Sequence, residues 1–227
     1  MQRQHTFSIG EYYHVYNRGV EKRDIFVDKK DRERFHKLLY IANSTIPFRF
    51  IEIENKSIEI INRGDPIVAI GAYVLMPNHF HILAKEITQN GLSTFMKKIA
   101  TGYSMYFNKK YERVGPLFQG RFKAEHVVRD EHLKYLYAYI HLNPVKLIEP
   151  KWKETGIKNK DRAFKFIERY YYSSYEDYCN AKRQEGKILT KDEFPQYFSK
   201  TYDFKTYIHD WLTLKEEYFE TLQGRSS

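Results

Sequence analysis

Two histidines separated by one residue are the first side chains whose spacing could do chemistry. His79 and His81 flank Phe80 in a run of apolar residues that reads as a strand. Residues two apart on a strand project to the same face, so both imidazoles point one way and Phe80 points the other. Such a pair is a ready two-point clamp for a metal ion. Taken alone, however, it is more often two exposed or hydrogen-bonded strand histidines.

A tyrosine and an asparagine four residues apart form the second candidate. Tyr139 and Asn143 precede Pro144 at the end of a predicted helix, where this spacing places them on one face. A hydroxyl and an amide oxygen could therefore be presented together at the edge of a sheet. The alternative is a packing tyrosine and a helix-terminal asparagine. His141 lies well round the helix from both, and we interpret it as structural.

Basic residues form the third candidate. A loop at 113–120 contains two glycines, which allow close backbone approach, and Arg121 and Lys123 then share one side of the following strand. Together they could grip a phosphate backbone, although a solvated basic strand would look the same. Arg18, at the end of an earlier strand, could face a phosphate or a carboxylate. His14 on that strand reads as a hydrogen-bonded sheet histidine rather than a ligand.

The composition favours a polyanionic partner. Lys and Arg number 38 against 29 Asp and Glu, which gives a net charge of +9 at pH 7. Phosphate contacts release counterions from nucleic acids, so an excess of this sign favours such a partner. The 20 tyrosines and 16 phenylalanines could stack on unpaired bases, although most must belong to the core.

The chain carries no sign of a membrane or secretory destination. Its longest apolar stretch, 67–76, has the length of a buried strand and is far short of a membrane span. The N-terminus lacks the apolar run of a secretory signal. The lone Cys179 excludes an intrachain disulfide and suggests a reducing compartment. We therefore expect a cytoplasmic protein.

The candidate residues need a scaffold, and the hydrophobic periodicity predicts one. Strands are expected at 12–18, 67–76, 79–85 and 121–128, helices at 29–43, 92–111 and from Asp130 to Pro144, and a hairpin at about 48–66. This order predicts an α+β fold, a ferredoxin-like antiparallel sheet with helices packed on one face. Residues 1–150 would form this domain. Residues 151–227 would form an aromatic-rich, mainly helical C-terminal extension with a frayed tail at 224–227.

Five segments, taken together and in this order, resemble the single-tyrosine HUH transposases, most closely the REP-associated tyrosine transposases of bacteria. They are YHVYNRG (13–19), YVLMPNHFHIL (73–83), GPLFQGRFK (115–123), YIHLNP (139–144) and, more loosely, SSYEDY (173–178). The resemblance covers about residues 7–180, and its two most specific segments hold the histidine pair and Tyr139. The sequence departs from the family at 48–66, which is longer than the usual connection.

The resemblance implies a ferredoxin-like fold in which the histidine strand faces the tyrosine helix. It implies that His79 and His81 bind a metal, that Asn143 is the third ligand, and that Tyr139 is the nucleophile. Imidazoles with an amide oxygen suit Mg²⁺ or Mn²⁺. Cleavage would leave a 5′-phosphotyrosine and a free 3′-OH. No nucleotide cofactor is needed, and the sequence has no GxxxxGK[ST] run.

The substrate implied by the family is single-stranded DNA beside hairpins, such as repetitive extragenic palindromes. The REP-associated branch of the family suggests a monomer. Our candidates for contact with the DNA backbone are Arg18, the 92–111 helix with Lys97 and Lys98, and the strand with Arg121 and Lys123.

Two other functions remain open on the sequence. A DNA- or RNA-binding regulator that does not cleave would need the same basic surface but would place no demand on Tyr139. A metal-dependent phosphoesterase could use an activated water and would leave no bond between protein and DNA.

Overall fold

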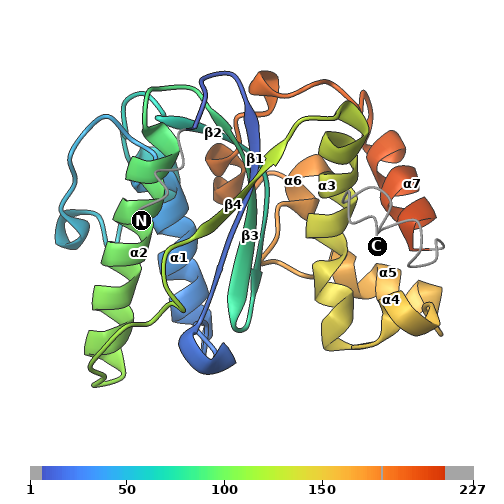
Figure 1. The fold of residues 1–227 in the computed structure, drawn as a ribbon, viewed down its shortest axis with the longest axis horizontal. Helices are drawn as coiled ribbons and strands as arrows, with labels where there is room; N and C mark the ends of the chain where they lie inside the picture. The colour runs from blue at the N-terminus through green and yellow to red at the C-terminus, as the bar shows by residue number, and fades with distance from the viewer. Residues whose placement is uncertain (1–6, 180, 213–227) are drawn as a thin grey trace, which may run out of the picture.

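The computed structural model describes residues 7–179 and 181–212 (Figure 1). Its four strands pair antiparallel in the order β2-β3-β1-β4, and they are β1 (Tyr12–Arg18), β2 (Val68–Met76), β3 (His79–Glu86) and β4 (Lys123–Val127). Helix α1 (Lys29–Ile41) connects β1 to β2, and α2 (Gly91–Lys110) connects β3 to β4. This βαββαβ order is that of a ferredoxin-like fold, so the predicted α+β class is confirmed.

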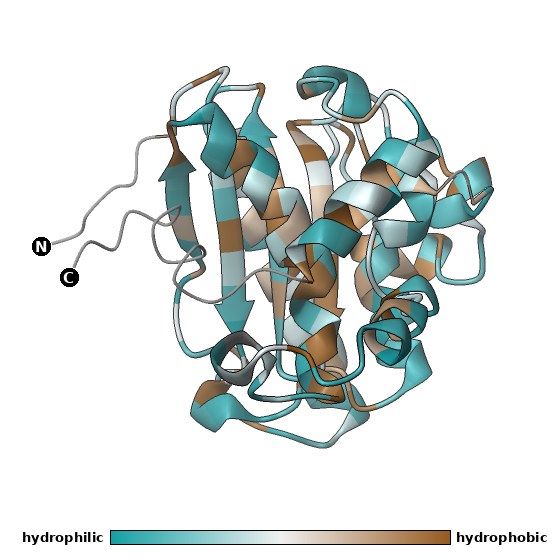
Figure 2. Cartoon of the chain, turned by 90° about the vertical axis from the view of Figure 1, so that its right-hand side faces the viewer, coloured by the Kyte–Doolittle hydropathy of each residue, from teal (hydrophilic) through white to brown (hydrophobic). Residues whose placement is uncertain are grey.

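Helices α1 and α2 lie side by side on one face of the sheet (Figure 1). Apolar residues recur along both helices at intervals of three and four, and these stripes face the strands. Phe35 of α1, for example, meets Phe80 of β3 with ring centroids 5.0 Å apart. Hydrophilic and hydrophobic bands alternate along strands of the sheet (Figure 2), as expected where the two faces of a strand meet different surroundings.

The helix that carries Tyr139, α3 (Asp130–Leu142), packs on the opposite face of the sheet. The prediction of helices on one face therefore holds for α1 and α2 but not for α3. The reason lies in β2, whose nine residues are all buried, so its second face also needs an apolar cover. Leu136 and Ile140 of α3 belong to the same buried cluster as Val74 of β2 and Leu83 of β3.

The C-terminal extension packs against α3. Within the described residues it contains α4 (Trp152–Thr155), α5 (Lys160–Glu168), α6 (Tyr175–Tyr178) and α7 (Thr201–Trp211), together with the 3-10 turns Gln184–Ile188 and Lys191–Glu193. Phe204 and Trp211 of α7 share a buried cluster with Tyr135 and Leu142 of α3. The domain boundary at 150 stays a prediction, and the tail at 224–227 lies outside the described residues.

The predicted hairpin at 48–66 is wrong. This segment contains two 3-10 turns, Phe50–Glu52 and Ile58–Ile60, and neither pairs with the sheet. Side chains of α1 satisfy its backbone instead, because Lys37 Nζ donates to the Ile53 carbonyl at 3.1 Å and Tyr40 Oη to the Ile61 carbonyl at 3.1 Å. The alternating apolar residues therefore pack beside a helix rather than across strands. No helix in the described part of the chain is long and apolar enough to span a membrane.

A buried carboxylate joins the two helices of the first face. The side chain of Asp31 at the start of α1 is fully buried and accepts hydrogen bonds from Lys110 Nζ at 2.7 Å, Tyr106 Oη at 3.0 Å and Tyr111 Oη at 2.8 Å. Burial acts to raise the pKa of Asp31, but the hydrogen bonds from Lys110 and Tyr111 outweigh it, so the pKa is lowered.

The Asp31→Ala substitution is expected to lower the free energy of unfolding by about 2–4 kcal/mol, because it leaves the hydroxyls of Tyr106 and Tyr111 without their acceptor and takes from Lys110 one of its two carboxylate partners, the other being Asp28. Urea denaturation would measure this. The control is Glu33→Ala, which removes an exposed ion pair with Lys29 and should cost less than about 1 kcal/mol. Because the folded pKa of Asp31 is lowered, its contribution is complete above the unfolded pKa, about 3.9, and is lost as the pH falls through the folded value. Equal denaturation midpoints for both variants would contradict this role.

Candidate active site

Three neighbouring strands present polar side chains on the face that looks toward α3. We call this set the polar face, and its members are His14, Tyr16 and Arg18 of β1, His79 and His81 of β3, and Lys123 and Glu125 of β4. The strand register places them in rows. Arg18 pairs with His79, Tyr16 with both His81 and Lys123, and His14 with Glu125. Alternation along each strand and the register between strands thus gather chemistry-bearing residues on one surface.

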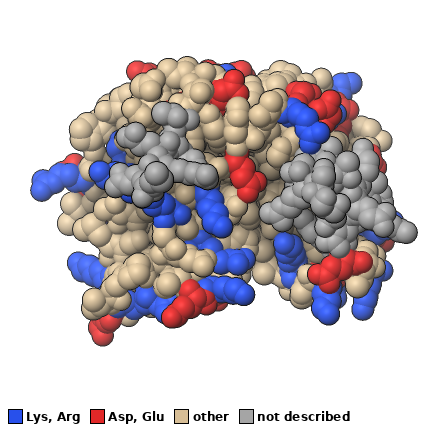
Figure 3. All heavy atoms as spheres, viewed as in Figure 1, with Lys and Arg blue, Asp and Glu red and all other residues tan. Residues whose placement is uncertain are grey.

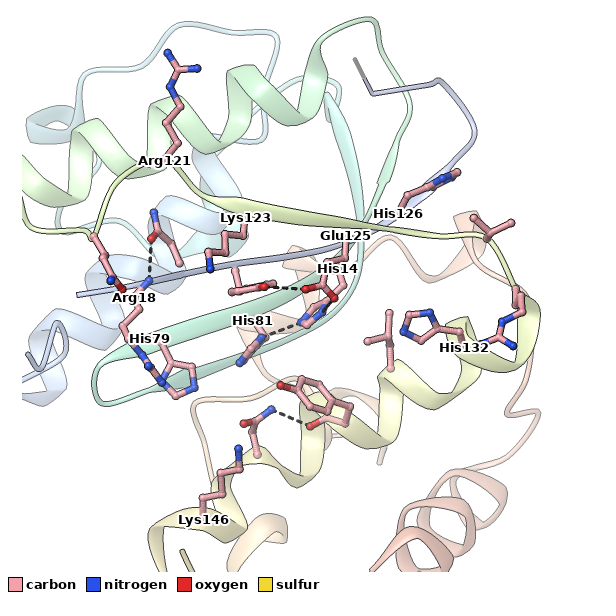
Figure 4. A pocket seen from close by; sticks show the side chains of 18 residues that line it. His14, Arg18, His79, His81, Arg121, Lys123, Glu125, His126, His132 and Lys146 are labelled. Atoms are coloured by element: carbon pink, nitrogen blue, oxygen red, sulfur yellow. Dashed lines mark hydrogen bonds and ion pairs between the residues drawn. The ribbon is translucent and has the colours of Figure 1, made fainter. Parts of the chain in front are cut away.

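A cavity of about 780 Å³ lies between the polar face and α3 (Figure 4). It lies beside the apolar contact of α3 with the sheet, which runs through residues such as Val74, Leu83 and Val127 and does not include the side chains of the polar face. The remaining lining comes mainly from α3 and the loop before β4, and includes Gln119, Arg121, Arg129, His132, Tyr139, Asn143 and Lys146. All residues predicted to bind metal or act as the nucleophile line this one cavity.

Both histidines of the pair use Nδ1 for a hydrogen bond. His81 Nδ1 lies 2.9 Å from His14 Nε2, and His79 Nδ1 lies 2.6 Å from Asn78 Oδ1. The Asn78 amide donates through Nδ2 to the Lys22 carbonyl at 3.0 Å, so its oxygen faces His79 and accepts the hydrogen bond. Burial, and the positive charges of Arg18 and Lys146, lower the pKa of His79 to about 4. His79 is therefore neutral at pH 7 and carries its lone pair on Nε2.

Tyr139 approaches the histidine pair from the helix side. Its ring packs edge-on against His81 at 5.4 Å between centroids and against His14 at 5.4 Å. One turn earlier on α3, the ring centroid of Tyr135 lies 6.0 Å from that of Tyr139. Tyr135 is fully buried in the cluster that joins α3 to the C-terminal extension. The C-terminal extension thus packs against one side of α3, while Tyr139 lines the cavity.

Asn143 offers an oxygen with no hydrogen-bond donor. Its Nδ2 donates to the Tyr139 carbonyl at 2.9 Å, which fixes the amide, and its buried Oδ1 accepts no hydrogen bond. A buried amide oxygen without a partner is costly unless it serves another ligand. No group of three or more His, Cys, Asp and Glu in the described residues could hold a metal. Two imidazoles and this orphaned amide oxygen are donor groups of the kind that fit a divalent cation.

The structure brings three of the five predicted DNA contacts to the cavity. Arg18, Arg121 and Lys123 line it. Viewed from the same side as in Figure 1, the molecule shows Lys and Arg side chains around its middle (Figure 3). Lys97 and Lys98 do not line the cavity, because α2 covers the other face of the sheet. Lys97 is exposed there, and Lys98 Nζ donates to the Ser44 carbonyl at 2.8 Å.

Sequence reasoning missed several residues of the site. Tyr16, Glu125 and Lys146 line the cavity, and His14 contacts His81 directly. Alternation along β1 could have placed His14 beside Arg18 on one face, but the sequence does not say that β1 lies between β3 and β4. His14 is hydrogen-bonded, as predicted, yet it lies within the site rather than elsewhere on the sheet.

The structural interpretation of His141 is confirmed. The side chain is fully buried on the far side of α3, with Nδ1 2.8 Å from the Tyr137 carbonyl and Nε2 2.7 Å from Ser174 Oγ. Ser174 also accepts from the Tyr73 amide at 2.9 Å, so the SSYEDY segment ties β2 to α3.

Residues 58–143 match the family model described as "Transposase IS200 like". This range contains His79, His81, Tyr139 and Asn143. The solved structure described as "Structure of the REP associates tyrosine transposase bound to a REP hairpin" is similar, with a TM-score of 0.47 and 12% identity over 79% of this chain and 86% of that chain. No curated protein matches the sequence. Residues 58–143 therefore resemble the IS200-like transposases, as the sequence predicted, and this family match supports a transposase-like function on DNA.

Proposed function

We propose that the protein is a metal-dependent single-stranded DNA endonuclease and strand transferase that acts through a covalent bond to Tyr139. The observation that carries this proposal is that three groups line one cavity: the Tyr139 side chain, the imidazole pair, and the Asn143 oxygen that accepts no hydrogen bond. The ring centroids of Tyr139 and His81 are 5.4 Å apart. The match to IS200-like transposases over the residues that hold these groups supports the same function.

The proposed cofactor is Mg²⁺ or Mn²⁺, held by His79, His81 and Asn143. Neutral imidazoles and an amide oxygen suit these cations, with water and a DNA phosphate completing the coordination. When bound, the cation would neutralise charge on the scissile phosphate and orient it.

The chain's own residues divide the remaining work. The Tyr139 oxygen forms a bond to phosphorus while the bond from phosphorus to the 3′ oxygen breaks, and the phenol releases a proton as the 3′ oxygen gains one. Arg18, Arg121 and Lys123 bind the neighbouring phosphates from the polar face and its edge. Attack by a different 3′-OH on the phosphotyrosine reverses the step and joins a new strand. The bond energy is conserved, so no nucleotide cofactor is required.

The proposed substrate is single-stranded DNA next to a hairpin formed by a palindromic repeat, bound by a monomer. The test uses such an oligonucleotide labelled at its 3′ end, incubated with the protein and Mn²⁺. A label that stays on the protein through denaturing electrophoresis, and that EDTA prevents, is the expected result. Cleavage without a labelled protein would favour the water-activating phosphoesterase, and binding without cleavage would favour a regulator.

A smaller effect is expected from the basic residues. Arg121→Ala and Lys123→Ala should each weaken DNA binding and reduce the slope of log affinity against log salt by about 0.7, the value for one phosphate contact on a single strand. Binding titrations at several salt concentrations would measure it. Lys97→Ala is the matched control, since Lys97 is an exposed cation on α2 and should leave the slope unchanged. If Lys97→Ala also reduced the slope of log affinity against log salt, α2 would have to be part of the DNA interface.

A further inference from the structure

A chain of hydrogen-bonding groups leads across the polar face to His81 (Figure 4). His14 Nε2 lies 2.9 Å from His81 Nδ1, and the two rings stack with centroids 5.0 Å apart. On its other side His14 Nδ1 faces Glu125 Oε2 at 3.7 Å. Glu125 Oε1 in turn accepts from the Tyr16 hydroxyl at 2.7 Å. His14 and His81 are 5% and 6% exposed, so bulk water cannot replace the contact between them.

The Glu125 carboxylate sets the direction in which the two histidines donate. A carboxylate only accepts hydrogen bonds, whereas a neutral imidazole has one N–H donor and one acceptor nitrogen. The Glu125 carboxylate lies 3.7 Å from His14 Nδ1, which is beyond hydrogen-bond distance, and its negative charge favours the proton of His14 on Nδ1. This leaves His14 Nε2 as an acceptor. His81 must then donate through Nδ1, and the lone pair of His81 resides on Nε2.

We propose that Glu125 and His14 are positioning residues that hold His81 in its metal-binding tautomer. The inference rests on the proposed function, because it explains how that site is prepared. His79 reaches the same state by a different route, since the Asn78 amide oxygen accepts from its Nδ1. Both imidazoles thus carry a lone pair on Nε2. His79 is oriented by the Asn78 amide, and His81 is oriented by Glu125 through His14. Such outer partners fix ring orientation and raise ligand basicity at metal sites.

The competing interpretation is that the histidines merely stack, in which case the charge of Glu125 is irrelevant to His81. The Glu125→Gln variant separates the two interpretations. Glu125 is half exposed, so the substitution should not disturb folding. The glutamine amide can donate to His14 Nδ1, and His14 Nε2 would then carry the proton and act as a donor. His81 Nδ1 would have to accept, so the proton of His81 would move to Nε2, the atom proposed to bind the metal.

The tautomers can be read directly by NMR. Long-range ¹H–¹⁵N spectra of protein labelled with ¹⁵N-histidine distinguish Nδ1–H from Nε2–H, and a His81→Asn variant assigns the signal. At about pH 8, above the ordinary pKa of histidine, wild-type His81 is expected to carry its proton on Nδ1. In Glu125→Gln a substantial Nε2–H population is expected. A wild-type His81 protonated on Nε2, or spectra that are identical in the two proteins, would overturn the inference.

Metal affinity supplies the second readout. Titration of Mn²⁺ followed by electron paramagnetic resonance should show a dissociation constant about 10- to 100-fold higher in Glu125→Gln than in the wild type. The matched control is Glu11→Gln, which removes a carboxylate 2.7 Å from His126 at the rim of the cavity and should leave the affinity unchanged. Equal affinities in Glu125→Gln and the wild type would defeat the positioning role.

Substitution of His14 adds a rescue test. His14→Phe keeps a ring but offers no acceptor to His81, whereas His14→Gln offers an amide oxygen, so Mn²⁺ affinity should be lower in the phenylalanine variant. Equal affinities in these two variants would count against the chain. A wild type that binds no Mn²⁺ but keeps the Nδ1–H tautomer would contradict the proposed metal site, while still supporting the orientation of His81 by His14 and Glu125.

Discussion

Replacing Tyr139 by phenylalanine is expected to abolish the labelled protein–DNA adduct and to reduce cleavage by about 10³-fold or more, because the oxygen proposed to attack phosphorus is lost. Hairpin DNA binding should survive, since the ring still packs against His81 and the basic residues of the cavity are untouched. Label transfer in denaturing gels and a binding titration measure the two effects separately.

The matched control is Tyr16→Phe. Tyr16 is a second tyrosine of the same cavity, and its ring lies 5.5 Å from His81, but its hydroxyl donates to Glu125. It is therefore the best rival nucleophile, and its variant should still become labelled. An adduct that persists in Tyr139→Phe and disappears in Tyr16→Phe would transfer the nucleophile to β1.

The second large effect is expected at Asn143. In Asn143→Leu we expect Mn²⁺ binding to weaken at least tenfold and cleavage to fall by about 100-fold or more, because one of the three proposed protein ligands is removed. Stability should respond differently. The substitution removes a buried oxygen without a donor, whose burial costs about 1–3 kcal/mol, and this offsets the loss of the hydrogen bond to the Tyr139 carbonyl.

The metal-free Asn143→Leu protein should therefore unfold at a urea concentration equal to or above that of the wild type. Asn143→Asp keeps an oxygen ligand and should retain Mn²⁺ binding. Asn108→Leu serves as the control, since Asn108 lies on α2 and its Nδ2 donates an exposed hydrogen bond to the carbonyl of Gly115 in the loop that follows. Unchanged Mn²⁺ affinity in Asn143→Leu would remove Asn143 from the site and leave its buried oxygen without an explanation.

The local elements of this protein could be predicted from its sequence because their signals are local. The intervals of three and four from Leu92 to Phe107 define α2, and the capping box of Asp28 and Asp31 marks the start of α1. Strand alternation alone placed His79 and His81 on one face, and helical spacing alone placed Tyr139 beside Asn143. Each pair is defined by a few consecutive residues, whose geometry depends little on the rest of the chain.

Tertiary structure decided how these pairs meet. The apolar run of β2 shows that both its faces are buried, but only packing puts α3 on the face opposite α1 and α2, and only this choice opens the cavity beside it. The alternating residues at 51–60 satisfied a hairpin pattern, yet hydrogen bonds from α1 held them in 3-10 turns. A two-residue period records which side chains share a face and not which neighbour covers it.

The same limit explains the residues that the sequence missed. His14 lies 67 residues from His81 along the chain, and Glu125 lies 111 residues beyond His14. They meet because β1 is inserted between β3 and β4, an arrangement set by long-range pairing. The sequence by itself determined the chemical groups and their local orientation. The tertiary fold decided which of those groups share a cavity, since the energy that selects strand neighbours comes from burying whole faces rather than from any one motif.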